Sequence, residues 1–199
     1  QRLIRDAIAR NALHFNTQDM SNVMLSLNQM DLSWDQLKDL ALETVLIKSI
    51  AQTAPDFKPQ NTANVMLALN QMGLSWDQLD FLGLQRLITK TIARTALQFN
   101  AKDTSDVMLS LNQMGLSWDQ LDFLGLQRLL REAIARNAPA FNAQETTNTM
   151  LSLNQMGVSW DQLDFLGLQG LIREAMARNA PAFNAQETAN VMLSLNQMD

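Results

Sequence analysis

The chain contains 199 residues, with no cysteine, no tyrosine and a single histidine, His14. This composition excludes disulfide frameworks, Cys-ligated zinc sites, thiol nucleophiles and clusters of metal-binding histidines. The 15 basic and 20 acidic residues give a net charge of −5, which provides no general attraction to nucleic acid or to an anionic membrane and favours a protein partner. No stretch reaches the roughly 18 apolar residues of a membrane span, so we expect no membrane association.

The four tryptophans, Trp34, Trp76, Trp118 and Trp160, recur at intervals of 42 residues. A fixed period of this length is typical of a tandem array of helical units. We expect a partial unit over residues 1–30 and complete units over 31–72, 73–114, 115–156 and 157–198, which form one array. We use the word column for the residues that occupy one position in successive units. The chain starts in the middle of a unit and without Met, so we interpret it as a fragment of a larger protein.

The first helix of each unit begins with a Ser cap, as the unit 115–156 illustrates. Ser117 with Gln120 forms a predicted capping box, in which each side chain accepts a hydrogen bond from the other residue's backbone. Apolar residues then follow helical spacing to about Asn137, where Pro139 cannot continue the helix. The apolar arc includes Phe123 and is wider than one stripe, which predicts an interior helix packed on both sides.

Gly125 interrupts this pattern and leaves two interpretations open. A glycine here could end a short helix, giving three helices in each unit, or it could lie within one continuous or kinked helix. The same column holds Ala41 in the unit 31–72, and alanine is strained at a positive φ. We therefore favour the continuous helix, with Gly83, Gly125 and Gly167 allowing a close approach of two backbones.

The second predicted helix of the same unit runs from an Asn142 cap with Glu145 to Met156, and Gly157 ends it. Only two residues separate its end from the next Ser cap, Ser159, so successive helices must be antiparallel neighbours. The fold class predicted is all-α: a right-handed α-solenoid, or superhelix, of 42-residue helix pairs, like HEAT and armadillo repeats.

The polar arc of the second helix carries amides and almost no charge. On a helical wheel Gln144, Asn148, Ser152 and Gln155 lie within about 80° of one another. In two-layer solenoids the second helix commonly lines the concave side, where amides can pair with an extended peptide backbone. The alternative is that these amides solvate an exposed face or bridge adjacent helices, and the neighbouring column of Asn28 and Asn112 is expected to connect units. The candidate binding residues are Gln18, Asn22, Gln29, Gln60, Asn64, Gln71, Asp106, Gln113, Gln144, Asn148, Gln155, Gln186, Asn190 and Gln197.

Most basic residues lie in the second half of the first helix, where stacking would produce a stripe. Regularly spaced arginines could follow a nucleic-acid backbone, and the phosphate-contact candidates are Arg86, Arg94, Arg128, Arg131, Arg136, Arg173 and Arg178. The alternative is compensation of the helix dipole, supported by Glu132 and Arg136 at i,i+4 spacing. No aromatic residue lies on the polar arc of the second helix to stack on bases.

The sequence does not indicate an enzyme, a cofactor or a metal site. His14 shares its column with Asp56, Gln98 and two alanines, which is typical of a surface position. Near-identical units do not supply the asymmetry that a catalytic site needs. The tryptophan and methionine columns are interpreted as core.

The segment Phe183 to Met198, FNAQETANVMLSLNQM, within a strict 42-residue period resembles the SKWP-repeat type III effectors of plant-pathogenic bacteria. That family is related to HEAT and armadillo repeats. The segment Phe57 to Asn64 is also similar to octotricopeptide repeats, a family of RNA-binding organelle proteins whose repeat is shorter by several residues. The first resemblance implies secretion by a type III system into a host cell and binding of a host protein or peptide. The second implies RNA binding, which is the alternative function.

Overall fold

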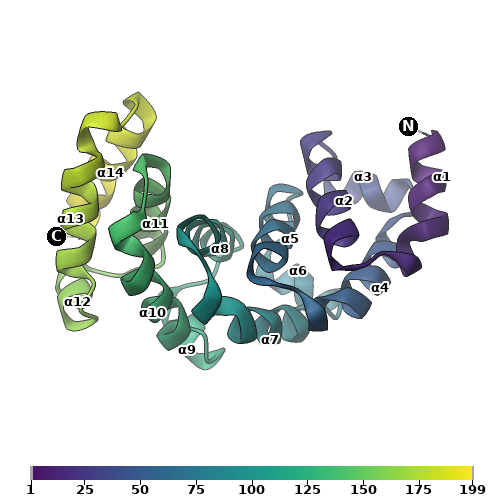
Figure 1. Ribbon diagram of the computed structural model, residues 1–199, viewed down its shortest axis with the longest axis horizontal. Coiled ribbons are helices and arrows are strands. Elements are labelled where there is room, and N and C mark those ends of the chain that lie inside the picture. Colours follow the sequence, from purple (N-terminus) through teal and green to yellow (C-terminus); the bar gives the residue numbers. More distant parts are fainter. Residues whose placement is uncertain (1, 199) are drawn as a thin grey trace. The chain divides into compact units, whose positions relative to one another are not determined.

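The computed structural model describes residues 2–198, and over this range the chain forms α-helices and short 3₁₀ turns and no β-strand (Figure 1). This confirms the prediction of an all-α tandem repeat. None of the helices in this range is long and apolar enough to cross a membrane. The right-handed superhelix remains a prediction.

Each complete repeat consists of a short helix, a middle helix, a 3₁₀ turn and a third helix. The partial repeat contains α1 Arg2–Asn11, η1 Ala12–His14 and α2 Thr17–Gln29. The next contains α3 Trp34–Asp39, α4 Glu43–Thr53, η2 Ala54–Asp56 and α5 Pro59–Gln71. It is followed by α6 Trp76–Phe81, α7 Gln85–Thr95, η3 Ala96–Gln98 and α8 Ala101–Gln113. The fourth contains α9 Trp118–Phe123, α10 Gln127–Asn137, η4 Ala138–Ala140 and α11 Ala143–Gln155. The last contains α12 Trp160–Phe165, α13 Gln169–Asn179, η5 Ala180–Ala182 and α14 Ala185–Met198.

The chain divides into two compact units, Gln1–Thr95 and Ala96–Asp199. In the first unit the third helices α2 and α5 pack side by side, and in the second α11 packs between α8 and α14 (Figure 1). Within each unit a middle helix packs against the 3₁₀ turn of the preceding repeat, as α4 does against η1 and α10 against η3. Each repeat therefore completes its core with the repeat before it.

The first predicted helix is two helices, so the expectation of one continuous helix was wrong. Gly83, Gly125 and Gly167 each adopt a φ of 69°, and Ala41 adopts 57° in the same column. The left-handed residue lets two backbone bonds close the short helix: the Leu126 N–H donates to the Leu121 carbonyl, and the Gly125 N–H to that of Asp122, both at 2.8 Å. The equivalent bonds around Ala41, from its own N–H to the Lys38 carbonyl at 2.8 Å and from the Leu42 N–H to the Leu37 carbonyl at 2.9 Å, offset a conformation that costs an L-residue roughly 1–2 kcal/mol.

The same break corrects two related expectations. A Cβ added at Gly125 would meet no heavy atom within 4 Å, so the glycine does not serve a close approach of two backbones. The change of direction also turns Phe123 outward, with 91% of its surface exposed, so it is not part of an interior arc. Leu121 before the break and Leu126 after it are both fully buried, and these two leucines hold the corner to the core.

The predicted caps are confirmed by their hydrogen bonds. The Ser117 N–H donates to Gln120 Oε1 at 2.8 Å, and the Gln120 N–H donates to Ser117 Oγ at 3.2 Å. Asn142 and Glu145 form the equivalent reciprocal pair, with both distances at 2.9 Å. Gly157 adopts a φ of 86° just past α11, as expected of a residue that ends a helix.

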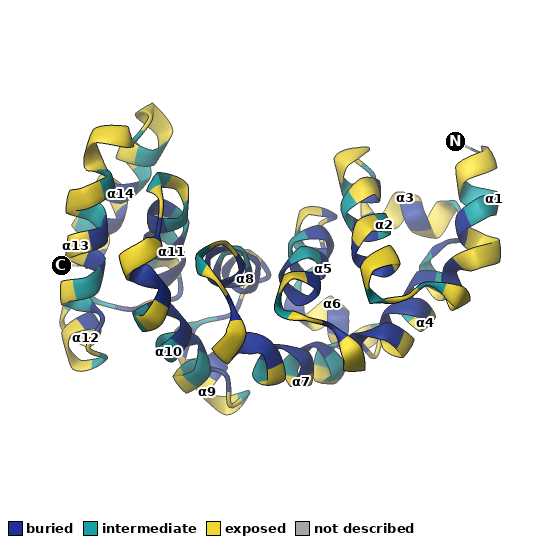
Figure 2. Ribbon diagram, viewed as in Figure 1, coloured by how far each residue is buried: buried dark blue, intermediate teal, exposed yellow. Residues whose placement is uncertain are grey.

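The tryptophans lie in the core, as predicted, except that Trp160 is only half-buried. Trp34, Trp76 and Trp118 each expose 5% of their surface. Most methionines of the third helices are buried as well, whereas Met192 on α14 is 62% exposed. Figure 2 shows correspondingly more exposed surface on α14 than on α8.

A buried asparagine, Asn137, and a half-buried one, Asn179, join neighbouring repeats within the second unit. Asn137 on α10 donates to the Phe99 carbonyl at 2.8 Å and to Thr104 Oγ1 at 2.9 Å. Asn179 makes the same two bonds to Phe141 and Thr146 one repeat later, at 2.7 and 2.9 Å. A buried carbonyl costs free energy if it is left without a partner, so these asparagines fix each middle helix against the preceding repeat.

Two glycines should respond oppositely to alanine because only one has a left-handed backbone. Gly125→Ala should lower the free energy of unfolding by about 0.5–1 kcal/mol, since the strain exceeds the entropy gained in the unfolded chain. Gly170 is the second residue of α13 with open space around it and no left-handed backbone, so Gly170→Ala should raise that energy by up to about 0.5 kcal/mol. Urea unfolding followed by circular dichroism measures both, and a stabilising Gly125→Ala would contradict the role of the left-handed turn.

Candidate functional site

The third helices carry the predicted amides on their outer faces. The structure describes all fourteen candidate residues, and each is exposed or half-buried. Ser152, which the helical wheel placed on the same arc, is instead fully buried and donates to the Asn148 carbonyl at 2.7 Å. The outer face therefore consists of the long amides, with the small hydroxyls turned back onto the helix.

Some of these amides are engaged within the protein. Asn28 Nδ2 donates to Gln71 Oε1 at 2.5 Å in the first unit, and Asn112 Nδ2 to Gln155 Oε1 at 2.6 Å in the second. These bonds connect adjacent third helices, as the sequence predicted for the asparagine column. The glutamine oxygens involved are therefore already occupied.

Three other candidates are paired with a residue of their own helix. Gln18 Nε2 donates to Asn22 Oδ1 at 2.9 Å on α2. On α8, Asp106 forms an ion pair with Lys102. Both pairs follow i,i+4 spacing on an outer face, as the solvated-surface alternative expects.

A polar groove lies between the first turns of α11 and α14, with a volume of about 260 Å³. It brings together four of the predicted residues, two from each helix. The residues that line it are Gln144, Thr147, Asn148, Asn184, Gln186, Glu187 and Asn190.

Thr147 gives this groove an unsatisfied polar group. The threonine is 2% exposed, and its Oγ1 has no hydrogen-bond partner among the described residues. In the first unit the corresponding hydroxyl of Ser21 accepts a bond from Asn61 Nδ2 at 3.0 Å. The last repeat has Glu187 in the column of Asn61, so the equivalent donor is absent. A buried hydroxyl without a partner is costly, and a ligand in the groove could provide one.

The basic stripe is largely occupied by bonds to the backbone. Arg94 Nη2 donates to the Ala54 carbonyl at 2.9 Å in the first unit. In the second unit Arg136 Nη2 donates to the Phe99 carbonyl at 3.0 Å, and Arg178 Nη2 to the Ala138 carbonyl at 2.9 Å. These arginines donate hydrogen bonds to backbone carbonyl groups at the ends of the preceding 3₁₀ turns. This structural role requires no phosphate ligand.

The remaining stripe residues have varied surroundings. Arg128 forms an ion pair with Glu132 at 2.7 Å. The expected pairing of Glu132 with Arg136 was wrong, because the Arg136 side chain binds the Phe99 carbonyl of the preceding repeat. Arg131 Nη1 donates to the Leu166 carbonyl at 3.1 Å. The Arg173 guanidinium lies 5.1 Å from the centroid of the Trp160 ring, and Arg86 is exposed.

An exposed phenylalanine column was missed by the sequence analysis. Phe81, Phe123 and Phe165 end the short helices with 90%, 91% and 91% of their surfaces exposed. The available signal was Asp39, which holds the same column in α3 and marks the position as solvent-facing.

Asp103 at the start of α8 has a perturbed carboxyl group. Burial raises its pKa above the ordinary value, opposed by a hydrogen bond from the Asn100 N–H, while Asp106 raises it further and Lys102 lowers it. No group of three or more His, Cys, Asp or Glu that could hold a metal ion occurs over the described range. Asp103 is therefore a buried carboxyl with a capping role, outside any metal-binding cluster.

The helices, caps and inter-repeat bonds define a tandem α-helical repeat protein. The family model for "Protein of unknown function (DUF1601)" matches residues 1–24, 30–66, 72–104, 114–150 and 156–192. The chain belongs to this family. Comparisons with curated proteins and with solved structures give no match. From residue 30 onward, each matched segment runs from the end of one third helix into the next, so the family repeat includes the left-handed turn and the groove-forming half of the third helix.

Asp103→Asn should stabilise the protein at neutral pH. A raised folded-state pKa means that the favourable contribution of the protonated carboxyl is present at low pH and is lost as the pH rises through the raised value. Asparagine keeps the neutral form, and Asn61 already performs this cap, accepting the Lys58 N–H at 3.1 Å. Thermal unfolding should give a higher Tm for the variant at pH 7 and a difference that vanishes near pH 3. Equal Tm values at pH 7 would contradict this.

Arg136→Ala and Arg86→Ala should separate a structural role from a phosphate-binding one. Loss of the Arg136 bonds to the 3₁₀ turn should lower the free energy of unfolding by about 0.5–1.5 kcal/mol. Arg86→Ala removes an exposed side chain and should change it by less than about 0.5 kcal/mol. Urea midpoints test this, and equal effects of the two substitutions would argue against the backbone bonds as the reason for the column.

Proposed function

We propose that this protein is a non-catalytic scaffold that binds an extended segment of another protein on the polar faces of its third helices. The observation that carries the proposal is the groove between α11 and α14, where amides from two helices surround the buried, unpartnered Thr147 hydroxyl. A face of this kind offers hydrogen bonds without requiring charge on the ligand.

Amides suit the recognition of a peptide backbone because each one carries both donors and acceptors. Asn148 and Asn190 lie on opposite walls of the groove and can address both the N–H and the C=O groups of an extended segment. Thr147 at the base supplies a further hydroxyl. Binding of the backbone would give a common affinity for extended segments, and the variable residues of each column would add selectivity.

The proposal that the protein is not an enzyme rests on His14 and on the repeated carboxylates. His14 is exposed in the short turn η1, away from any groove described above. The carboxylates of Asp103, Glu145 and Glu187 cap the third helices, which accounts for their recurrence at that position. A binding role uses such repetition directly, because each repeat can contact successive residues of a ligand.

The identity of the partner belongs to this proposal as well. The resemblance to SKWP-repeat effectors supports a bacterial protein secreted by a type III system that binds a host protein or peptide. RNA binding of the octotricopeptide type is the alternative. It is disfavoured by the net charge of −5 and by the backbone bonds of Arg94, Arg136 and Arg178.

The test uses linear peptides selected on the full 199-residue chain from a random displayed library and measured by fluorescence anisotropy. The variant carries Asn64→Ala, Asn148→Ala and Asn190→Ala. Loss of about two neutral hydrogen bonds should weaken binding by about 5-fold to 150-fold. Circular dichroism should show unchanged helicity, since these amides face outward.

Gln98→Ala is the matched control, because this exposed amide lies outside the polar faces and its column already contains Ala140 and Ala182. It should leave peptide affinity unchanged. Equal affinities for the control and the triple variant would exclude the amide face as the binding site. Binding of a poly(U) oligonucleotide with a steep loss of affinity on added salt, and no peptide binding, would favour the RNA alternative.

A further inference from the structure

The exposed phenylalanines are not required by the fold. The short helix α3 has the same Ser cap and capping box as α9 and ends with Asp39 in place of phenylalanine. The short helix therefore forms with a polar residue at this position as well. Three phenylalanines that each expose about nine-tenths of their surface form a repeated apolar feature, which marks an interaction site more often than an isolated exposed residue does.

Each of these rings shares its short helix with two aspartates. In the second unit α9 carries Asp119 and Asp122, and α12 carries Asp161 and Asp164, all exposed. Neither helix contains a lysine or an arginine, and these carboxylates form no ion pair within the described part of the chain. In the first unit α6 repeats the pattern around Phe81. The short helices thus combine an apolar ring with unneutralised negative charge.

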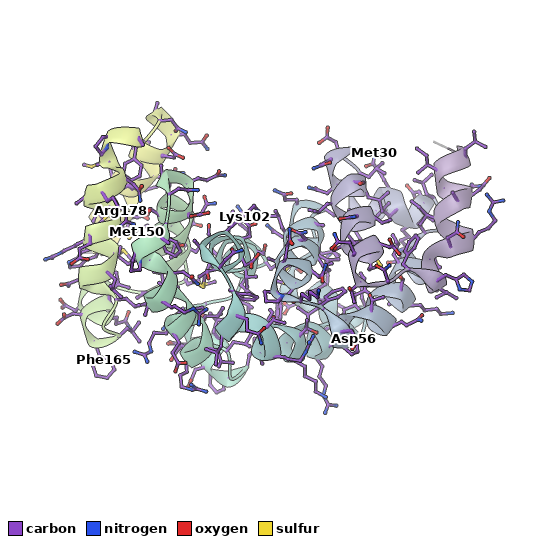
Figure 3. All side chains as sticks on the ribbon, in the orientation of Figure 1. Met30, Asp56, Lys102, Met150, Phe165 and Arg178 are labelled. Atoms are coloured by element: carbon purple, nitrogen blue, oxygen red, sulfur yellow. The ribbon has the colours of Figure 1, made fainter. Side chains whose placement is uncertain are left out.

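A groove of about 160 Å³ lies between α9 and α12 and brings these features together. The lining residues are Trp118 and Asp119 of α9, Gln127 of α10, and Gln162, Phe165 and Leu166 at and just after α12, and Gln127 Nε2 donates to the Trp118 carbonyl at 3.2 Å. Figure 3 shows the Phe165 side chain pointing away from the ribbon, so its ring forms an open wall. The groove therefore has both a carboxylate and an exposed aromatic ring in its lining.

The last repeat shows which kind of side chain packs on the tryptophan of a short helix. Trp160 corresponds to Trp118, and the guanidinium of the chain's own Arg173 lies over its ring at 5.1 Å from the centroid. Attraction between a cation and an aromatic face contributes about 0.5–1 kcal/mol at exposed sites. In the groove between α9 and α12, Trp118 exposes only 5% of its surface, and Arg131, which corresponds to Arg173, donates to the Leu166 carbonyl at 3.1 Å. An arginine supplied from outside would therefore meet the exposed Phe165 ring and the Asp119 carboxylate.

We propose that the short helices form a second binding surface, separate from the amide face, for a basic protein segment in which arginines alternate with apolar residues. The arginines enter the groove between Asp119 and Phe165, and the apolar residues cover the exposed rings. Charge complementarity selects this partner and excludes nucleic acid and anionic membranes, which the aspartates repel.

The experiment measures binding of a labelled ten-residue peptide of alternating Arg and Leu to the 199-residue chain by fluorescence anisotropy. A peptide with Glu in place of Arg should not bind. The double variant Phe123→Asp and Phe165→Asp should lose at least about 10-fold in affinity. These substitutions add two negative charges, which alone would strengthen binding, so a loss is attributable to the rings. Unchanged or stronger binding would overturn the proposal.

Two charge-matched variants separate a local site from general attraction to an acidic protein. Asp119→Asn with Asp122→Asn should weaken binding and its dependence on salt, whereas Asp35→Asn with Asp39→Asn in α3, which lacks the ring, should not. Equal losses in both variants would overturn the proposal. The Asn148→Ala and Asn190→Ala substitutions in the amide groove should leave this peptide's affinity unchanged, so failure here is distinguishable from failure of the proposed function.

Discussion

The left-handed residue between the short and the middle helix sets the path of the chain in every complete repeat. At this residue the chain changes direction, the short helix closes on two backbone hydrogen bonds, and the middle helix starts at an angle that brings it to the preceding 3₁₀ turn. The outward phenylalanines and the buried leucines on either side of the turn both follow from this change of direction. Ala41 shows that the requirement is strong, since the turn forms even without glycine.

Side-chain hydrogen bonds of two kinds then align the repeats. Near one end of the middle helix, arginine and asparagine bind carbonyl groups of the preceding turn. Near the end of the third helix, an asparagine binds a glutamine of the next repeat. Both sets of hydrogen bonds join consecutive repeats, so the polar residues of one repeat stabilise the adjacent repeat as well as their own. This arrangement accounts for uncharged amides and exposed arginines without any ligand at many of their positions.

The sequence was sufficient to predict the period, the caps, the buried tryptophans and the solvent-facing amides, because each depends on local rules that a single unit displays. It misled at Gly125, where the cost of a left-handed alanine at Ala41 was given more weight than the hydrogen bonds that offset it. Phe123 was misplaced as a consequence, since its direction depends on that turn. The partners of Gln155 and Arg136 lie in other repeats, so no pattern within one unit could reveal which side chains are already occupied. The groove at Thr147 depends on the pairing of two particular units and was likewise out of reach.

The bonds from each middle helix to the preceding turn have a consequence for unfolding. An array held by such contacts behaves as a chain of nearest-neighbour couplings, in which opening one repeat removes partners from the next. Asn137 and Asn179, for example, would leave the carbonyls of Phe99 and Phe141 unpaired if their helices separated. These polar groups at the repeat junctions therefore couple neighbouring repeats of the second unit, in addition to the apolar core that the repeats share, and opening one junction exposes carbonyl groups of the repeat before it.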